Sequence, residues 1–127
     1  ALEYKDFQQM PVWQKAMKLG EDVFYLTEPL PRKEDYGLTS QIRRSALSIS
    51  ANLSEGFGRG HVKDKVNFYY HARGSLAETK NHLLYGLKVK YFPRDRVDSL
   101  IEKIAEIWKE LNKLIGSFRK QIDSSSN

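Results

Sequence analysis

The chain contains no cysteine, which excludes disulfide bonds and thiolate metal sites and permits a reducing compartment. It also lacks a long apolar run, because charged residues interrupt the apolar clusters every few positions. The sequence therefore predicts no transmembrane helix and no membrane partner, and in the absence of a signal peptide we expect a cytoplasmic protein. No useful stretch alternates apolar and polar residues, so no strands are expected.

Positive charge is distributed unevenly along the chain. The 127 residues carry a net charge of +5 and are 40% hydrophobic, enough for one domain with one core. Residues 61–92 contain six basic and two acidic side chains, whereas residues 1–30 contain three basic and five acidic ones. A basic region of this kind can attract phosphates and makes binding sensitive to salt, although many basic proteins never meet nucleic acid.

Proline and glycine residues divide the chain into four helical segments. Pro29 and Pro31 close the first, the glycines within 56–60 close the second, and Pro93 follows the third. The predicted helices span about residues 12–27, 34–57, 62–91 and 94–121 within one domain, 1–123, and the tail 124–127 is expected to be disordered. Because the connections are short, we predict an all-α fold, an antiparallel up-down-up-down four-helix bundle.

The second segment carries two parallel stripes with different chemistry. The apolar stripe predicts a core-facing surface and consists of Leu38, Ile42, Ala46, Ile49, Leu53 and Phe57. The polar stripe beside it consists of Gln41, Arg44, Ser48, Asn52, Glu55 and Arg59. A solvated face has no need for this mixture of amide, guanidinium, hydroxyl and carboxylate groups. The polar stripe therefore indicates either a hydrogen-bonded seam or a recognition surface.

The third segment places charges inside its apolar arc. The apolar members are Val62, Val66, Tyr69, Leu76, Leu84, Leu87 and Tyr91. Arg73 and Lys80 project from the same arc, so we expect Arg73 to pair with a carboxylate, for which Glu55 is a candidate, or to extend its stem along the apolar surface.

The opposite side of the third segment predicts a contact surface. Ser75 and Glu78 lie there beside two histidines, with Gly74 and aromatic residues nearby. These two polar residues are expected to form hydrogen bonds across a helix or subunit interface. A helix with aromatic or apolar residues on most sides favours a homo-oligomer, whose number of subunits the periodicity does not fix.

Catalytic and metal sites are not expected. The chain has no cysteine nucleophile and no G-x-S-x-G serine, and the spacing of His71, Glu78 and His82 does not suit a metal. The glycine-rich run 56–60 follows a helix and lacks the Gly-Lys-Ser/Thr ending of a P-loop. Its free N–H groups could still hold a phosphate at the start of the third helix. No cofactor is predicted.

The run YGLTSQIRRSALSISANLSEGFGRG at 36–60, preceded by Trp13, Pro31 and Glu34 and followed by ARGSLAE at 72–78, carries a family resemblance. It resembles the 23S rRNA intervening-sequence (S23) proteins, which are distantly similar to the accessory variability determinants of diversity-generating retroelements. The resemblance implies an antiparallel four-helix bundle, a homopentamer and a basic surface for nucleic acid. Arg73 stands where a lysine is frequent in that family, which keeps the charge but changes the hydrogen-bond geometry.

Two hypotheses for function follow. The first is a non-enzymatic, homo-oligomeric nucleic-acid-binding protein that contacts the phosphates of RNA or structured DNA. Its basic ring would comprise Arg43, Arg44, Arg59, Lys63 and Lys65. The second is a protein-interaction scaffold whose polar seam is structural. The residues of that seam or interface would be Gln41, Ser48, Asn52, Glu55, Arg73, Ser75 and Glu78. Only the first hypothesis predicts a steep salt dependence.

Overall fold

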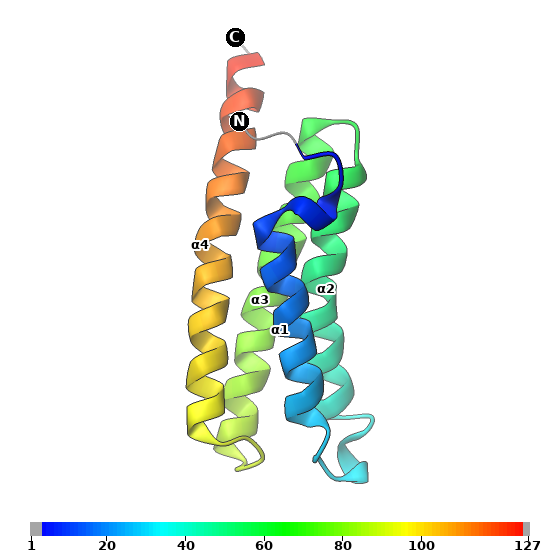
Figure 1. Ribbon diagram of the computed structural model, residues 1–127, viewed down its shortest axis with the longest axis vertical. Helices are drawn as coiled ribbons and strands as arrows, with labels where there is room; N and C mark the ends of the chain where they lie inside the picture. Colours follow the sequence, from blue (N-terminus) through cyan, green and yellow to red (C-terminus); the bar gives the residue numbers. More distant parts are fainter. Residues whose placement is uncertain (1–3, 126–127) are drawn as a thin grey trace.

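Four long helices make up the fold of the computed structural model, which describes residues 4–125 (Figure 1). The helices are α1 (Pro11–Thr27), α2 (Leu38–Gly58), α3 (Val62–Lys88) and α4 (Arg94–Ser125). Two short 3-10 turns, η1 (Phe7–Gln9) and η2 (Arg32–Glu34), precede α1 and α2. The described residues contain no strand, and the prediction of an all-α four-helix bundle is confirmed.

Consecutive helices run in opposite directions, as the order of colours in Figure 1 shows. Contacts between side chains agree with this arrangement. Lys15 near the start of α1 forms ion pairs with α4 at Glu106 and Glu110, while Asp22 near its end reaches back to Lys103. These pairs fix α1 antiparallel to α4 and close the bundle.

The core is formed by apolar residues on the inner face of every helix. In α2 the buried residues include Leu38, Ile42, Ala46, Ile49 and Leu53, as the apolar stripe predicts. In α3 the prediction for Leu84 is wrong, because this side chain is 42% exposed. The buried leucines are Leu76 and Leu83, which follow Tyr69 at seven-residue spacing because packed helices keep a repeat closer to 3.5 than to 3.6 residues per turn.

Two helices begin or end away from their predicted bounds. α2 begins at Leu38 and not at 34, because η2 comes first and the carboxylate of Glu34 accepts the N–H of Leu38 at 3.1 Å. α4 continues to Ser125 and not to 121, so residues 124 and 125 of the predicted disordered tail are helical. The rest of that tail lies outside the described residues.

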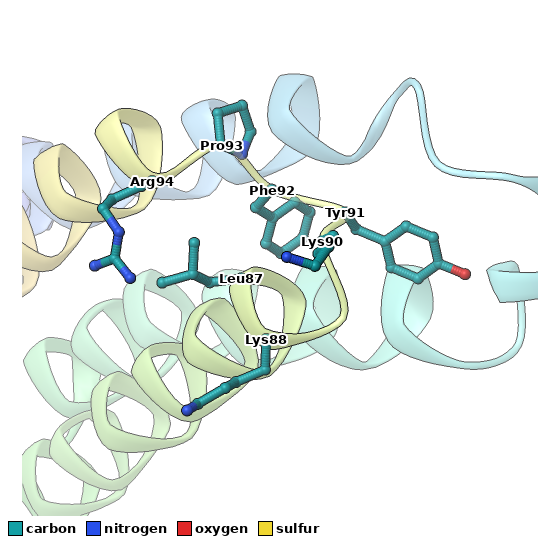
Figure 2. A pocket seen from close by; sticks show the side chains of 7 residues that line it. All are labelled: Leu87, Lys88, Lys90, Tyr91, Phe92, Pro93 and Arg94. Carbon is teal, nitrogen blue, oxygen red and sulfur yellow. The ribbon is translucent and has the colours of Figure 1, made fainter.

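α3 ends at Lys88 and not at residue 91. Lys90 adopts the left-handed conformation with a φ of 68°, which turns the chain away from the helix. The N–H groups of Tyr91 and Phe92 then both donate hydrogen bonds to the carbonyl of Gly86, at 2.9 and 3.2 Å. This termination satisfies the last carbonyls of α3 and brings the ring of Phe92 back over its final turn, at the end of the bundle shown in Figure 2.

Gly86 is required by this return of the chain, because a Cβ atom there would overlap the buried ring of Phe92. We expect Gly86→Ala to lower the free energy of unfolding by about 1–3 kcal/mol. Gly74 is the matched control in the same helix, since nothing lies within 4 Å of its missing Cβ. Gly74→Ala should raise the free energy by about 0.5–1 kcal/mol. Urea denaturation measures both, and equal effects would contradict this account of the α3 terminus.

The contact between Asp22 and α4 predicts a loss of stability in acid. Burial alone would raise the pKa of Asp22, but hydrogen bonds from Lys103 and Lys18 outweigh it and leave that pKa below its ordinary 3.8. The group therefore stabilises the fold above pH 4 or so, and this contribution is lost as the pH falls through the folded-state pKa. Asp22→Asn should flatten the fall in stability between about pH 4 and pH 2, measured by urea denaturation across pH. An unchanged profile would contradict this role for Asp22.

Candidate functional site

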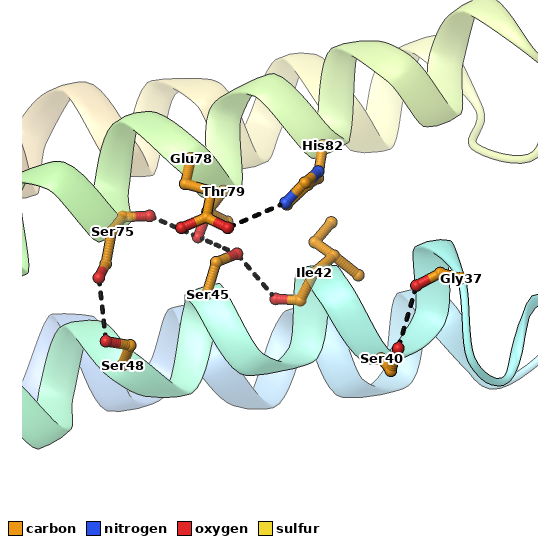
Figure 3. A network of polar contacts seen from close by, with 9 residues as sticks. All are labelled: Gly37, Ser40, Ile42, Ser45, Ser48, Ser75, Glu78, Thr79 and His82. Carbon is orange, nitrogen blue, oxygen red and sulfur yellow. Dashed lines mark hydrogen bonds and ion pairs between the residues drawn. The ribbon is translucent and has the colours of Figure 1, made fainter.

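Hydroxyl groups join α2 to α3 along their shared surface (Figure 3). The hydroxyl oxygens of Ser45 and Thr79, both buried, lie 2.9 Å apart with one donating to the other. One turn further, Ser75 donates to Ser48 at 3.0 Å, and the amide of Asn52 also donates to Ser48, at 2.9 Å. Ser48, Asn52 and Ser75 are thus brought together within one chain, and their hydrogen bonds serve the contact between the two helices.

The other members of the predicted polar seam lie apart from this network. The carboxylate of Glu78 accepts from His82 within α3 at 3.4 Å. Glu55 in α2 lies 3.9 Å from Arg59, the residue that follows this helix. Gln41 is exposed. Sequence reasoning missed Ser45 and Thr79. The available signal was their position, because each lies three or four residues from apolar residues on the buried face of its helix.

Arg73 does not pair with Glu55, so this candidate pairing is wrong. Its guanidinium faces α4, where it donates to the side-chain oxygen of Asn112 at 2.9 Å. The guanidinium carbon lies 4.9 Å from the ring centre of Tyr70 and 5.5 Å from that of Trp108. Glu55 belongs to α2, where it forms an ion pair with Arg59. The charge of Arg73 therefore lies close to two rings, and no carboxylate of residues 4–125 pairs with it.

Arg43 and Lys65 of the predicted basic ring have structural contacts. The guanidinium of Arg43 donates to the hydroxyl of Thr27 at 2.7 Å and to the carbonyl of Phe24 at 3.2 Å, and forms an ion pair with Glu28. These contacts tie α2 to the end of α1.

Lys65 caps the end of α2. Its ammonium donates to the carbonyls of Gly56 at 3.3 Å and Phe57 at 2.7 Å, and burial lowers the pKa of this lysine. Arg43 and Lys65 are therefore used inside the chain, and the five cations do not form one cluster in the monomer.

The remaining candidates, Arg44, Arg59 and Lys63, are exposed. Arg59 lies over the ring of Phe68, with 4.6 Å between guanidinium carbon and ring centre. Arg44 is fifteen residues earlier in α2, roughly 22 Å away along the helix. Lys63, at the start of α3, lines a surface hollow together with Arg119 from the end of α4.

The surface where α3 meets α4 brings together cations that sequence reasoning did not combine. One hollow is lined by Lys63, Val66, Asn67, Tyr70, Arg119 and Ile122. A second is lined by Ala77, Lys80, Ile101, Ile104, Ala105 and Trp108. Because the helices are antiparallel, the hydrogen bond from Arg73 to Asn112 lies between the two hollows. We call the surface formed by both hollows and this bond the α3–α4 face.

The signal for this face was present in the sequence. Lys63, Tyr70 and Ala77 follow one another at seven-residue intervals, as do Arg73 and Lys80. The sequence marks Arg73 and Lys80 as charges inside an apolar arc. What could not be read from α3 alone was that Trp108 and Arg119 of α4 lie beside them.

Residues 4–125 contain neither a cluster of metal-ligating side chains nor a helix suited to cross a membrane. No group of three or more histidine, aspartate or glutamate side chains is placed to hold a metal ion in this part of the chain. Among the helices of the same range, none combines the length and the apolar character needed to cross a membrane.

The hydroxyl pair of Ser45 and Thr79 predicts a measurable coupling between α2 and α3. Thr79→Val and Ser45→Ala should each lower the free energy of unfolding by about 1 kcal/mol, since the partner hydroxyl still has a backbone carbonyl to donate to. The double variant should lose about as much as either single variant. Ser117→Ala, which removes an exposed hydroxyl, is the control. Fully additive losses in urea denaturation would show that the pair does not couple the helices.

Comparison with known proteins places this bundle in a family. The family model of the 23S rRNA-intervening sequence protein matches residues 8–113. The chain is also similar in fold to the crystal structure of a protein of unknown function from the S23 ribosomal protein family of Bacteroides thetaiotaomicron VPI-5482, with a TM-score of 0.74 and 23% identity. That similarity covers 82% of this chain and 97% of the other. A comparison with curated proteins finds no match. The family match spans most of the chain, which therefore belongs to the 23S rRNA-intervening sequence protein family.

Proposed function

We propose that the protein is a non-enzymatic, cytoplasmic, homo-oligomeric nucleic-acid-binding protein that contacts phosphates through a basic surface. The observation that supports this most is the hollow shared by Lys63 and Arg119, which contains no carboxylate among its lining residues. Neither cation forms an ion pair in the part of the chain that the structure describes. Two unpaired cations from different helices in one hollow suit a phosphate group.

The surroundings of this hollow strengthen the positive potential. Between Glu110 and Asp123, α4 carries Lys113, Arg119 and Lys120 and no acidic residue. Between Asp64 and Glu78, α3 likewise has only basic charges. The neighbouring hollow at the start of α3 contains one acid, Asp64, beside His61 and Lys63. A local excess of this kind attracts polyanions even when the whole chain has a modest charge.

Self-association would multiply this charge around a symmetry axis. Several large apolar side chains are exposed on the monomer, namely Leu47, Leu84, Tyr85 and Val89. Such residues are typical of surfaces that become buried between subunits. The resemblance to the S23 family implies a pentamer, whose repeated cations would bind one polyanion at several points.

The non-enzymatic part of the proposal is supported by how the polar groups are used. The hydroxyls of Ser45, Thr79, Ser48 and Ser75 are occupied with one another, and Lys65 is occupied with helix carbonyls. These groups stabilise contacts between helices.

A paired charge reversal tests the basic surface. The double variant Lys63→Glu and Arg119→Glu should weaken binding of a fluorescent structured RNA at low salt by at least about tenfold and reduce the slope of log K against log salt by roughly 1.5. The control, Arg32→Glu with Lys33→Glu, changes the net charge equally at the opposite end of the bundle (Figure 1). It should change the affinity less than about twofold.

Equal losses in the two double variants would contradict a specific phosphate surface. Failure of the unchanged protein to bind structured RNA or duplex DNA at low salt would favour the alternative, a protein-interaction scaffold. Size-exclusion chromatography with light scattering tests the assembly in the same samples. A pentamer of 14.8 kDa chains has a mass of about 74 kDa, and a monomer would contradict the oligomeric part.

A further inference from the structure

Two aromatic rings interrupt the row of cations on the α3–α4 face. Tyr70 is 37% exposed and Trp108 is 39% exposed, so part of each side chain is accessible to solvent and not buried in the core. Both contact the guanidinium of Arg73, which lies 4.9 Å from the centre of Tyr70 and 5.5 Å from the centre of Trp108. A cation and two half-exposed rings are thus held together at the middle of this face.

Arg73 keeps its charge available while its position is fixed. Its one hydrogen-bond partner among the described residues is the neutral amide of Asn112, at 2.9 Å. The rings contribute a favourable interaction with the cation without neutralising it. A phosphate that binds at this point therefore meets an arginine that is already oriented. Because the side chain is already ordered, binding costs it little further conformational entropy.

Small side chains leave one ring accessible. The hollow beside Trp108 is lined by Ala77 and Ala105 together with Lys80 and two isoleucines. Alanine at these two positions is too small to cover the indole, and Lys80 lines the same hollow. An apolar surface next to a cation that has no ion pair within residues 4–125 fits a planar base attached to a phosphate.

The length of the face suits a chain of several nucleotides. Lys63 and Lys80 are seventeen residues apart on α3, which corresponds to roughly 25 Å. The rise of about 3.4 Å per phosphate in a stacked strand sets an upper limit of roughly seven nucleotides for this distance, and a more extended single strand covers it with fewer.

We propose that the α3–α4 face binds single-stranded nucleic acid, with bases stacked on Tyr70 and Trp108. The phosphates contact the cations of the face, which are Lys63, Arg73, Lys80 and Arg119. A duplex is excluded from this mode, because its bases are stacked on one another and offer no free face to a protein ring. This inference rests on the proposed function and names the class of nucleic acid that the basic surface takes.

Leucine substitutions remove the aromatic ring but keep an apolar side chain and leave the net charge unchanged. Trp108→Leu and Tyr70→Leu should each weaken binding of a 20-nucleotide oligouridine and of a 20-nucleotide oligothymidine about tenfold. Binding of a 20-base-pair duplex should change less than about twofold. Tyr36→Leu is the matched control, since Tyr36 is 97% exposed in the α1–α2 connection, and it should leave all three affinities unchanged. The two single strands distinguish RNA from DNA.

Tryptophan fluorescence gives a second readout that does not depend on stability. The chain has two tryptophans, and Trp13 packs against Phe7 on another part of the bundle. In Trp13→Phe, where Trp108 is the one indole left, oligouridine should quench the emission. In Trp108→Phe, where Trp13 remains, the same oligonucleotide should leave the emission unchanged.

The outcomes separate this inference from the proposed function. If the leucine variants bind single strands as the unchanged protein does, or if the Trp108 emission does not respond, stacking is wrong while the effect of Lys63→Glu with Arg119→Glu still supports the proposed function. If no probe binds at low salt, both fail. If Trp108→Leu converts an oligomer into a monomer by light scattering, the face is a subunit interface and the inference is overturned.

Discussion

The close packing of α2 against α3 is the constraint on which the rest of the bundle depends. At one end, Gly56 lies against the buried ring of Tyr69, where a Cβ atom would come within 2.8 Å of that ring. Further along, two hydroxyls, Ser45 and Thr79, meet in the core at 2.9 Å. Small side chains at these positions let the two backbones approach each other. The hydrogen bond between the two hydroxyls favours this register, because a shift of either helix would break it.

This register decides which cations are used inside the fold and which face solvent. Lys65 is brought under the end of α2 and satisfies its carbonyls, while Arg43 is turned toward α1. Arg73 is turned the other way, toward α4, where it meets rings and an amide. A surface with unpaired positive charge and accessible aromatic rings is a consequence of this division, and it lies on the side of α3 opposite the hydroxyl network.

Much of the fold could be predicted from the sequence, because helix periodicity and helix-stopping residues are local signals. The stripe from Leu38 to Leu53 is buried as expected, and the family resemblance carried by the run 36–60 agrees with the family match. The end of α3 could not be predicted in this way. It depends on Lys90 adopting a positive φ so that Phe92 can return to the helix, which is a tertiary contact.

The candidate site was less predictable, since it depends on which helices become neighbours. The sequence correctly marked Arg73 as a charge that needs a partner, but it offered Glu55, which lies on the wrong helix. It grouped Arg43 and Lys65 with exposed cations because a sequence does not show which ammonium or guanidinium groups reach a carbonyl. Trp108 and Arg119 lie within the fourth predicted helix, 94–121, and their place beside α3 follows only from the packing of α4.

The most direct measurement is photo-crosslinking of an oligonucleotide that carries 5-iodouracil, followed by identification of the crosslinked peptides by mass spectrometry. The account predicts crosslinks at Tyr70 or Trp108, with the single strand giving a much higher yield than the duplex. Crosslinks confined to aromatic residues of α1 or the α1–α2 connection, such as Tyr25 or Tyr36, would contradict it, because those rings lie away from the α3–α4 face.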